Sequence, residues 1–196
     1  IKMKKHLFVA IAFFSLIGFK PEVKAQPVLN TVLEYCTGTW CQWCPCGHTI
    51  INNFLINHPN TMVLAYHGAG SDPWQSYSAG IRGIFGMNSY PTGIVGRRTG
   101  IISRSAWAGW VNYQSTLPAG VSIAVTSKNY NSGTRTITMT VVTTPLANLD
   151  GMYNINFVLT EDNLIYGQTG NSSCPPAYDP NYVHNHVVKG MINGDL

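Results

Sequence analysis

The sequence is poor in charged residues. Only 10% of its 196 residues are Asp, Glu, Lys or Arg, against roughly 25% in an average soluble protein. Ser, Thr, Asn and Gly supply much of the polarity instead, a composition common in exported β-rich proteins. Apolar residues still make up 45% of the chain, which is enough for a core and excludes a disordered protein. The length fits one domain or two small ones.

The sequence also lacks an apolar run long enough to span a bilayer, which takes about 20 residues. The run Leu7–Phe19 has 13 residues, and no other stretch is apolar enough. Lysines at positions 2, 4 and 5 precede this run, and Val23-Lys24-Ala25 follows it with small residues flanking a lysine. This order predicts a secretory signal peptide over residues 1–25, the alternative being a buried N-terminal helix.

The formal charge of +4 belongs to this leader. Residues 1–25 hold five of the 12 Lys and Arg residues and one of the eight Asp and Glu residues. The 171 residues that remain carry seven of each sign, so the mature chain is neutral. A neutral chain gives no reason to expect nucleic acid or an anionic membrane surface as a partner.

Five cysteines lie in the mature part of the chain: Cys36, Cys41, Cys44, Cys46 and Cys174. Export places them in an oxidising compartment, where disulfides persist. Because five is an odd number, at least one thiol is free or bonds to another molecule.

The first half of the mature chain alternates strand and helix signals. Buried apolar runs, helical spacing of apolar residues and Pro or Gly at the breaks predict the order β-α-β-α-β-β-α. These elements are expected over residues 28–35, 41–58, 61–67, 71–84, 92–96, 100–103 and 105–114. A domain boundary is expected at Leu117–Gly120, which makes residues 26–118 an α/β domain of thioredoxin-like order.

The pattern changes to a period of two in the second half. Apolar residues alternate with Ser, Thr and Asn over 121–126, 136–143 and 154–157, and a final strand is expected over 182–191. Asn131-Ser132-Gly133 is typical of a hairpin turn between the first two strands. Residues 119–196 are therefore expected to form an all-β, immunoglobulin-like sandwich, incomplete because four strands are too few to close one.

Chemistry is concentrated in Trp40-Cys41-Gln42-Trp43-Cys44-Pro45. Two cysteines at this spacing, where a strand leads into a helix, can form a disulfide across the first helical turn. The unpaired N–H groups and partial positive charge of a helix N-terminus stabilise a thiolate. We expect Cys41 to be the attacking sulfur and Cys44 the resolving one, with a static local disulfide and metal binding as alternatives.

Two further residues are candidates for this site. Pro91 opens a strand at the place where a thioredoxin fold has its cis-proline, which faces the cysteine pair and shapes the substrate groove; the alternative is an ordinary trans proline in a loop. Glu34, one position shifted, matches the buried acid of thioredoxin that relays the proton of the resolving thiol. A glutamate at a strand edge that faces solvent is the alternative reading.

Several motifs together resemble one known family. They are Leu33-Glu34-Tyr35-Cys36-Thr37-Gly38-Thr39-Trp40-Cys41, Cys44-Pro45, Tyr90-Pro91-Thr92-Gly93 with Arg97, Thr160-Glu161-Asp162, and Tyr182-Val183-His184-Asn185-His186. The mature chain is similar over most of its length to the twenty-eight-kilodalton outer membrane proteins of Gram-negative bacteria. The resemblance implies a thioredoxin-like domain followed by a β-sandwich, and a surface or adhesin-type protein. Its members often end in a secretion-sorting domain, and this sequence is expected to stop before one.

The chain departs from that family at two cysteines. Members usually have a non-cysteine residue where Cys36 stands and often a basic residue where Cys46 stands. Cys36 and Cys46 could bond to each other, or one of them could capture Cys174. A pairing of Cys36 with Cys41 or Cys44 would lock or reroute the redox site.

Two groups of residues are candidates for metal binding. The residues Cys36, Cys41, Cys44, Cys46 and His48 are rich enough in ligands for zinc, but zinc ribbons have two well-separated pairs and export favours oxidised sulfur. His184 and His186 would share one face of a strand and could chelate, although two ligands are too few. We therefore expect no metal and no cofactor other than the redox-active disulfide.

These observations predict an exported protein of the periplasm, the outer membrane surface or the medium, with no transmembrane helix in the mature chain. Its expected activity is thiol–disulfide exchange with extracytoplasmic protein thiols. The alternative is a non-catalytic adhesin-type surface protein that uses the thioredoxin fold as a scaffold around a static disulfide.

Overall fold

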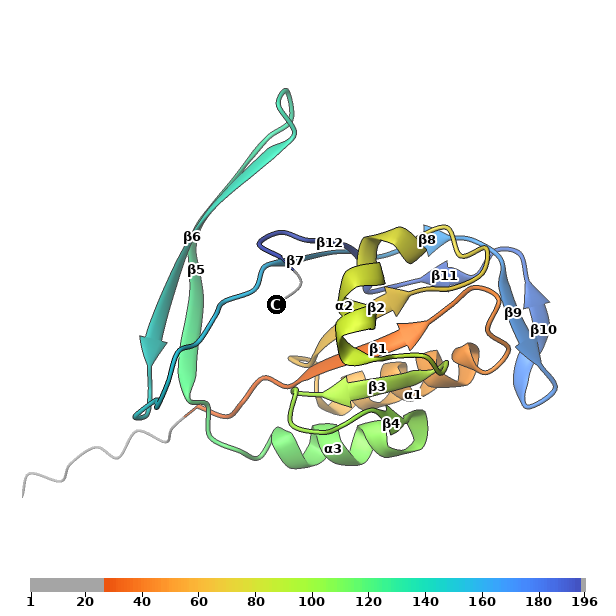
Figure 1. The fold of residues 1–196 in the computed structure, drawn as a ribbon, viewed down its shortest axis with the longest axis horizontal. Helices are drawn as coiled ribbons and strands as arrows, with labels where there is room; N and C mark the ends of the chain where they lie inside the picture. Colours follow the sequence, from red (N-terminus) through yellow and green to blue (C-terminus); the bar gives the residue numbers. More distant parts are fainter. Residues whose placement is uncertain (1–26, 195–196) are drawn as a thin grey trace, which may run out of the picture.

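The computed structural model describes residues 27–194 and shows a mixed α/β fold (Figure 1). The predicted signal peptide, residues 1–25, lies outside the described residues. The first part contains β1 (Val32–Thr37), α1 (Cys44–Asn57), β2 (Met62–His67), η1 (Gln75–Ser78), α2 (Ala79–Phe85), β3 (Thr92–Val95), β4 (Ile102–Ser103), η2 (Arg104–Ala106) and α3 (Trp107–Gln114). This order agrees with the β-α-β-α-β-β-α order expected from the sequence.

The second part contains eight strands. They are β5 (Val121–Asn131), β6 (Thr136–Pro145), β7 (Val158–Glu161), β8 (Leu164–Ile165), β9 (Gln168–Asn171), β10 (Cys174–Asp179), β11 (Val183–His184) and β12 (Val187–Met191). The β5–β6 hairpin turns at the expected residues, where the Asn131 side chain accepts a hydrogen bond from the Thr134 N–H.

A six-stranded sheet of order β4-β3-β1-β2-β12-β7 forms the centre of the molecule. β1, β2 and β12 run parallel, whereas β3 and β7 are antiparallel to their neighbours. β7 and β12 come from beyond the expected domain boundary. The strands of residues 119–196 are therefore divided between this sheet and three two-stranded sheets within the described residues, and the expected immunoglobulin-like sandwich is not seen there.

Helices cover both faces of the sheet. Alternate residues of β1 point to opposite sides, as the period of two in a strand requires. Leu33 and Tyr35 pack with residues of α1 and α3, including Phe54 and Trp107. Cys36 packs on the other face with residues of α2, β3 and β12. The result is an α/β/α arrangement in which α1 and α3 share one face.

Three segments differ from the expected pattern. The alternating stretch 154–157 is not a strand, because Phe157 bonds through its N–H to the Asn193 side chain and pairing begins only at Val158. Residues 167–181, which lie outside the strands expected from the sequence, fold into the β9–β10 hairpin. The expected strand 182–191 is interrupted at His186, whose φ of 60° separates β11 from β12.

Candidate functional site

The Cys-x-x-Cys segment lies where β1 passes into α1. Cys41 and Cys44 form a disulfide, with their Cα atoms 5.4 Å apart. The helix begins at Cys44 rather than at Cys41 as expected, with Pro45 in its first turn, where a missing N–H costs nothing. The bond to Cys44 nevertheless holds the sulfur of Cys41 at the helix N-terminus. Both residues are buried, with exposed fractions of 3% and 0%.

Pro91 lies beside this helix. The Tyr90–Pro91 peptide bond is cis, as expected from its position before β3. A Cβ atom on Gly47 would come within 3.2 Å of Pro91 Cγ, so the proline packs against α1 close to Cys44. The structure therefore places Pro91 against the first turns of the helix that carries Cys44.

Trp40, which precedes Cys41, is fixed by backbone acceptors. Its indole N–H lies 3.0 Å from the Gly68 carbonyl and 2.9 Å from that of Ala69. Its ring packs edge-on against Tyr90, with 5.1 Å between ring centroids. The segment before Cys41 is therefore tied both to the end of β2 and to the residue before Pro91.

The buried carboxylate of Asp72 also holds the segment before Cys41, through hydrogen bonds. One oxygen accepts hydrogen bonds from the Thr39 N–H at 2.9 Å and from His67 Nδ1 at 2.8 Å, and the other accepts from the Trp74 N–H at 2.9 Å. Burial alone would raise the pKa of Asp72, but its hydrogen bonds to His67, Thr39 and Trp74 bring that pKa below its usual value. Asp72 lies at the start of the segment 71–84, which is expected to be helical, and no sequence signal points to this role.

Histidines and aromatic rings surround this anchor. His184 of β11 packs edge-on against His67 and Trp74, with centroid distances of 5.4 and 5.0 Å. His48 of α1 contacts Thr37 Oγ1 at 3.0 Å through Nε2 and Tyr182 Oη at 2.7 Å through Nδ1. The cluster therefore links the cysteine-bearing helix to the C-terminal strands.

Two of these histidines stay neutral well below neutral pH. Burial, together with the neighbouring His184, His67 and His186, lowers the pKa of His48 to about 3. Burial and His67 lower the pKa of His184 to about 4. His184 Nε2 lies 3.2 Å from the Tyr166 carbonyl, whereas its buried Nδ1 has no hydrogen-bond partner within residues 27–194.

The structure shows which disulfide the remaining cysteines form. Cys46 in the first turn of α1 bonds to Cys174 of β10, 128 positions away. Cys36 is the free thiol among the described residues, and burial raises its pKa to about 12, which keeps it protonated. Of the pairings left open by the sequence, the capture of Cys174 by Cys46 is the one observed.

Strand β9 lies directly against the Cys-x-x-Cys segment, a contact that the sequence did not reveal. The Thr169 N–H donates to the Thr39 carbonyl at 2.8 Å. The Gln168 side-chain amide lies 3.2 Å from the Gly38 carbonyl and 3.0 Å from that of Cys41. Cys174 was the one signal in this stretch, because a lone distant cysteine needs a partner.

Glu34 is buried, but it is not brought to the disulfide. Leu33 and Tyr35 point toward α1, so Glu34 points to the opposite face of β1. Its carboxylate accepts two hydrogen bonds from Arg97, at 2.8 and 2.9 Å, and one from Tyr66 Oη at 2.7 Å. The alternative of a glutamate that faces solvent is not observed, because Glu34 is buried. A proton-relay role stays a prediction, and the position of Glu34 on this face does not favour it.

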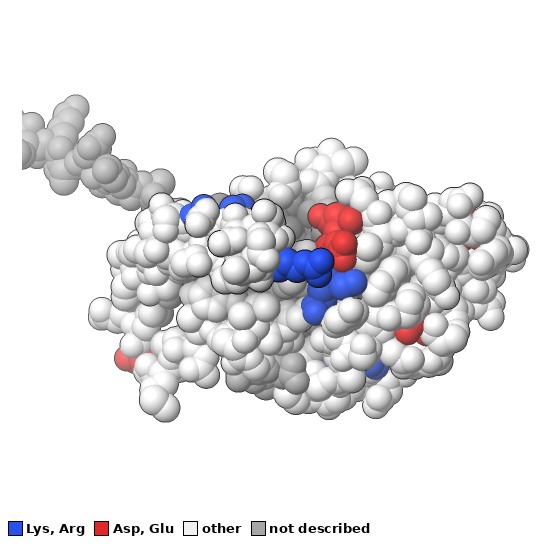
Figure 2. All heavy atoms as spheres, turned by 90° about the horizontal axis from the view of Figure 1, so that it is seen from above, with Lys and Arg blue, Asp and Glu red and all other residues white. Residues whose placement is uncertain are grey.

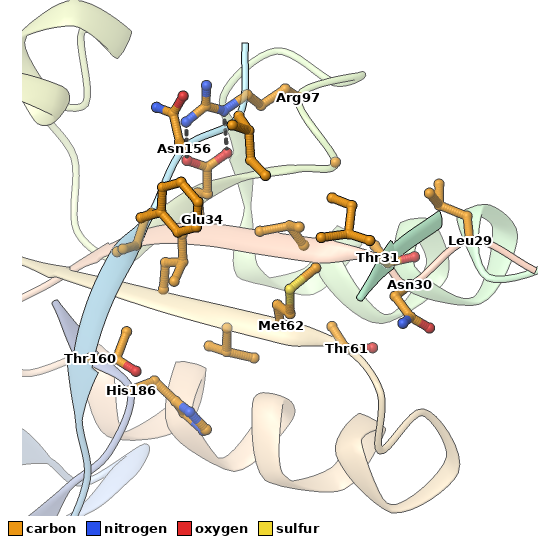
Figure 3. Close-up of a pocket in the computed structure, with 18 of the residues that line it drawn as sticks. Leu29, Asn30, Thr31, Glu34, Thr61, Met62, Arg97, Asn156, Thr160 and His186 are labelled. Carbon is orange, nitrogen blue, oxygen red and sulfur yellow. Dashed lines mark hydrogen bonds and ion pairs between the residues drawn. The ribbon is translucent and has the colours of Figure 1, made fainter. Parts of the chain in front are cut away.

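Glu34 and Arg97 instead border a pocket of about 830 Å³ between the central sheet and the β5–β6 hairpin. Figure 3 shows Arg97 over Glu34, with Asn156 beside both. Most other lining residues are apolar, among them Met62, Val125 and Phe157.

Neither metal reading is supported by the arrangement of the ligands. Cys41, Cys44 and Cys46 are oxidised, so they are not available as thiolates. His184 is buried in β11, whereas His186 lies beyond the end of that strand, so the two do not share a strand face. Within residues 27–194 no group of three or more His, Cys, Asp or Glu side chains is placed to hold a metal ion.

Charged side chains are sparse on the surface. Figure 2 shows one mostly uncharged face on which basic and acidic groups lie side by side. Lys189 of β12 and Glu161 of β7 form an ion pair, with 3.2 Å between Nζ and Oε2. None of the helices formed by residues 27–194 has the length and apolar character needed to cross a membrane.

The fold and the site define a mixed α/β protein that carries a disulfide at a strand-to-helix junction and a second one that ties a distant hairpin to the same helix. The family model for Outer membrane protein Omp28 matches residues 80–196, so the chain belongs to that family. The expected family resemblance is thereby confirmed over more than half of the chain, and the protein is exported to the outer membrane surface.

Two solved structures are similar. HBP35 of Porphyromonas gingivalis has a TM-score of 0.60 and 18% sequence identity, with 88% of this chain and 59% of that chain covered. Protein AGR_C_4864 from Agrobacterium tumefaciens has a TM-score of 0.47 and 15% identity, with 85% and 73% covered. The first likeness concerns the fold alone, and this chain spans about 59% of the length of HBP35. A comparison with curated proteins gives no match.

Proposed function

We propose that this chain is a thioredoxin-like protein of the outer membrane surface that exchanges disulfides with extracytoplasmic protein thiols. The observation that carries the proposal is the Cys41–Cys44 disulfide at the N-terminus of α1, with Pro91 packed against the same helix at Gly47. The order of the first seven major elements, from β1 to α3, supports the thioredoxin-like layout. The partners are protein thiols, and the disulfide itself is the only redox group required.

The exchange balances with these two sulfurs. A substrate thiolate attacks the sulfur of Cys41, the Cys41–Cys44 bond breaks, and Cys44 leaves as a thiolate near the helix N-terminus, where the N–H groups stabilise it. A second substrate thiolate then attacks the mixed disulfide and releases Cys41. The substrate leaves as a disulfide and the cysteine pair as a dithiol, after a transfer of two electrons and two protons. In reverse, Cys41 attacks and Cys44 resolves.

A scaffold role is the second candidate, and the burial of both cysteines favours it. Structural disulfides in secreted proteins typically have reduction potentials below about −300 mV. A Cys41–Cys44 disulfide that stays buried and is never reduced would have such a low potential.

The reduction potential of the Cys41–Cys44 pair separates the two functions. It is measured by equilibration in thiol–disulfide buffers, alkylation and peptide mass spectrometry, and is combined with an assay of disulfide exchange on a test protein. We expect a potential above about −300 mV, exchange by the wild type and none by Cys41→Ser. Cys36→Ser is the matched control, since this buried thiol lies on the other face of the sheet. Equal activity of wild type and Cys41→Ser would overturn the proposal.

A further inference from the structure

The two disulfides differ in how well solvent reaches them. Cys41 and Cys44 are 3% and 0% exposed. Cys46 is partly exposed, although its partner Cys174 is buried. A thiolate reductant therefore meets less burial at Cys46 than at either cysteine of the Cys-x-x-Cys pair.

The β9–β10 hairpin is the segment that lies over the buried pair. Three of its residues bond to consecutive parts of the loop that carries Cys41. Thr169 donates to Thr39, the Gln168 amide to Gly38 and Cys41, and the Asn171 amide to the carbonyl of Gln42 at 3.1 Å. Figure 1 shows this hairpin at the end of the molecule where β1 leads into α1.

Gln168 is the central contact of this cover. Its side chain is almost fully buried, and its amide nitrogen points to the loop carbonyls, including that of Cys41 itself. Removal of the hairpin would expose these carbonyls to water and uncover the cysteine pair. The β9–β10 hairpin is thus held by hydrogen bonds to the loop that contains Cys41, the residue attacked in the proposed exchange.

The Cys46–Cys174 bond ties the cover down. Cys46 lies in the first turn of α1, two positions after Cys44, and Cys174 opens β10. Residues two positions apart on a helix do not face each other, so the two disulfides are not arranged for direct exchange. The second disulfide therefore acts through the position of the hairpin.

We propose that the β9–β10 hairpin is a gate over the Cys41–Cys44 pair and that the Cys46–Cys174 disulfide is its redox latch. A dithiol reductant attacks the sulfur of Cys46 and releases Cys174 as a thiolate, which takes up a proton. The second thiol of the reductant then frees Cys46 and leaves as a disulfide, after a transfer of two electrons. With the crosslink gone, the hairpin opens and substrate thiols reach Cys41. This regulation rests on the proposed exchange, but the opening of the gate is measurable without an exchange partner.

The test follows each disulfide of the full chain during reduction by dithiothreitol, with alkylation and peptide mass spectrometry at each time point. In the wild type, Cys46 and Cys174 are labelled before Cys41 and Cys44. In Cys46→Ser/Cys174→Ser, the Cys41–Cys44 pair is reduced faster by about tenfold, which corresponds to about 1.4 kcal/mol in the opening equilibrium. Reduction of Cys41–Cys44 at the wild-type rate in this variant would overturn the gate.

A second variant keeps both disulfides and guards against a misfolded double variant. Gln168→Ala removes the amide that holds the Cys41 loop, and we expect faster reduction of Cys41–Cys44 here as well. Asn129→Ala, which removes an exposed amide from β5, is the control and leaves the rate unchanged. If circular dichroism shows that the double variant does not fold, Gln168→Ala alone decides. An unchanged rate of Cys41–Cys44 reduction in Gln168→Ala then overturns the gate.

The outcomes separate this inference from the proposed function. Faster reduction in the variants without exchange on a test protein supports the gate and overturns the exchange function. Exchange on the test protein with unchanged reduction rates supports the function and overturns the gate. Unchanged rates without exchange overturn both.

Discussion

Arg97 donates two hydrogen bonds, of 2.8 and 2.9 Å, from the turn after β3 to the carboxylate of Glu34 in the centre of the sheet. The Glu34 side chain is 2% exposed, whereas that of Arg97 is 39% exposed. The carboxylate therefore depends for its charge balance on a residue that reaches it from the surface. The pair borders the pocket between the central sheet and the β5–β6 hairpin.

Replacement of Arg97 by Met should destabilise the protein by about 2 kcal/mol, because a buried carboxylate then loses its cation. Loss of one partner of a fully buried pair costs about 3–5 kcal/mol, and the partial exposure of Arg97 reduces that figure. Urea unfolding monitored by circular dichroism gives the free energy of unfolding. Arg98→Met is the matched control, since Arg98 is exposed and has no ion pair within residues 27–194; an equal loss in both variants would contradict this account.

The local framework of the site could be read from the sequence. Strand and helix signals placed Cys41 and Cys44 at a strand-to-helix junction, and the position of Pro91 before a strand predicted its cis bond. These features depend on residues close together in the chain, where apolar spacing and proline act directly on the backbone.

The contacts that the C-terminal strands make with the site could not be predicted from such local patterns. A period of two is the same in a sandwich strand and in a strand added to an existing sheet, so it did not reveal that β12 pairs with β2. The partner of Cys46 is 128 positions away, and cysteine spacing does not fix connectivity. Asp72 lies in a segment expected to be helical and Gln168 lies between expected strands, so neither position points to the loop before Cys44.

His184 should make the folded protein lose stability in mild acid. Burial and His67 lower its pKa from 6.5 to about 4 in the folded state. As the pH falls below about 6.5 the unfolded chain gains a proton at this histidine that the folded chain does not, so unfolding becomes more favourable. The cost rises by about 1.4 kcal/mol per pH unit until about pH 4, where the folded protein also binds the proton.

Chemical unfolding measured between pH 4 and pH 7 checks this effect. His184→Gln should flatten the pH dependence by up to one proton, even if the variant is less stable at pH 7. Asn129→Ala, an exposed and non-titrating position of β5, should leave the slope unchanged. A slope in His184→Gln identical to that of the wild type would show that other groups account for the acid loss.

Asp72→Asn should destabilise the protein by about 3 kcal/mol, because it disturbs the buried hydrogen bond with His67 and weakens the bonds from the Thr39 and Trp74 N–H groups, which a charged acceptor makes strong. The His67 and Trp74 rings are 4.8 Å apart, so the fluorescence of the tryptophan should also change. Thermal unfolding gives the loss of stability. Asp150→Asn, in the exposed segment before β7, is the control, and a loss below about 0.5 kcal/mol in Asp72→Asn would refute the anchoring role.

Two glycines should respond to alanine in opposite directions. A Cβ at Gly93 would lie 2.8 Å from the Glu34 carbonyl oxygen and 2.9 Å from Tyr35 Cβ, both on the paired strand β1, which cannot withdraw without breaking the sheet. Gly93→Ala should therefore cost about 2 kcal/mol. A Cβ at Gly109, inside α3, would meet no atom within 4 Å, so Gly109→Ala should stabilise the helix by about 0.5–1 kcal/mol. Urea unfolding of both variants measures the two effects, and a Gly93→Ala variant as stable as the wild type would contradict the close pairing of β1 and β3.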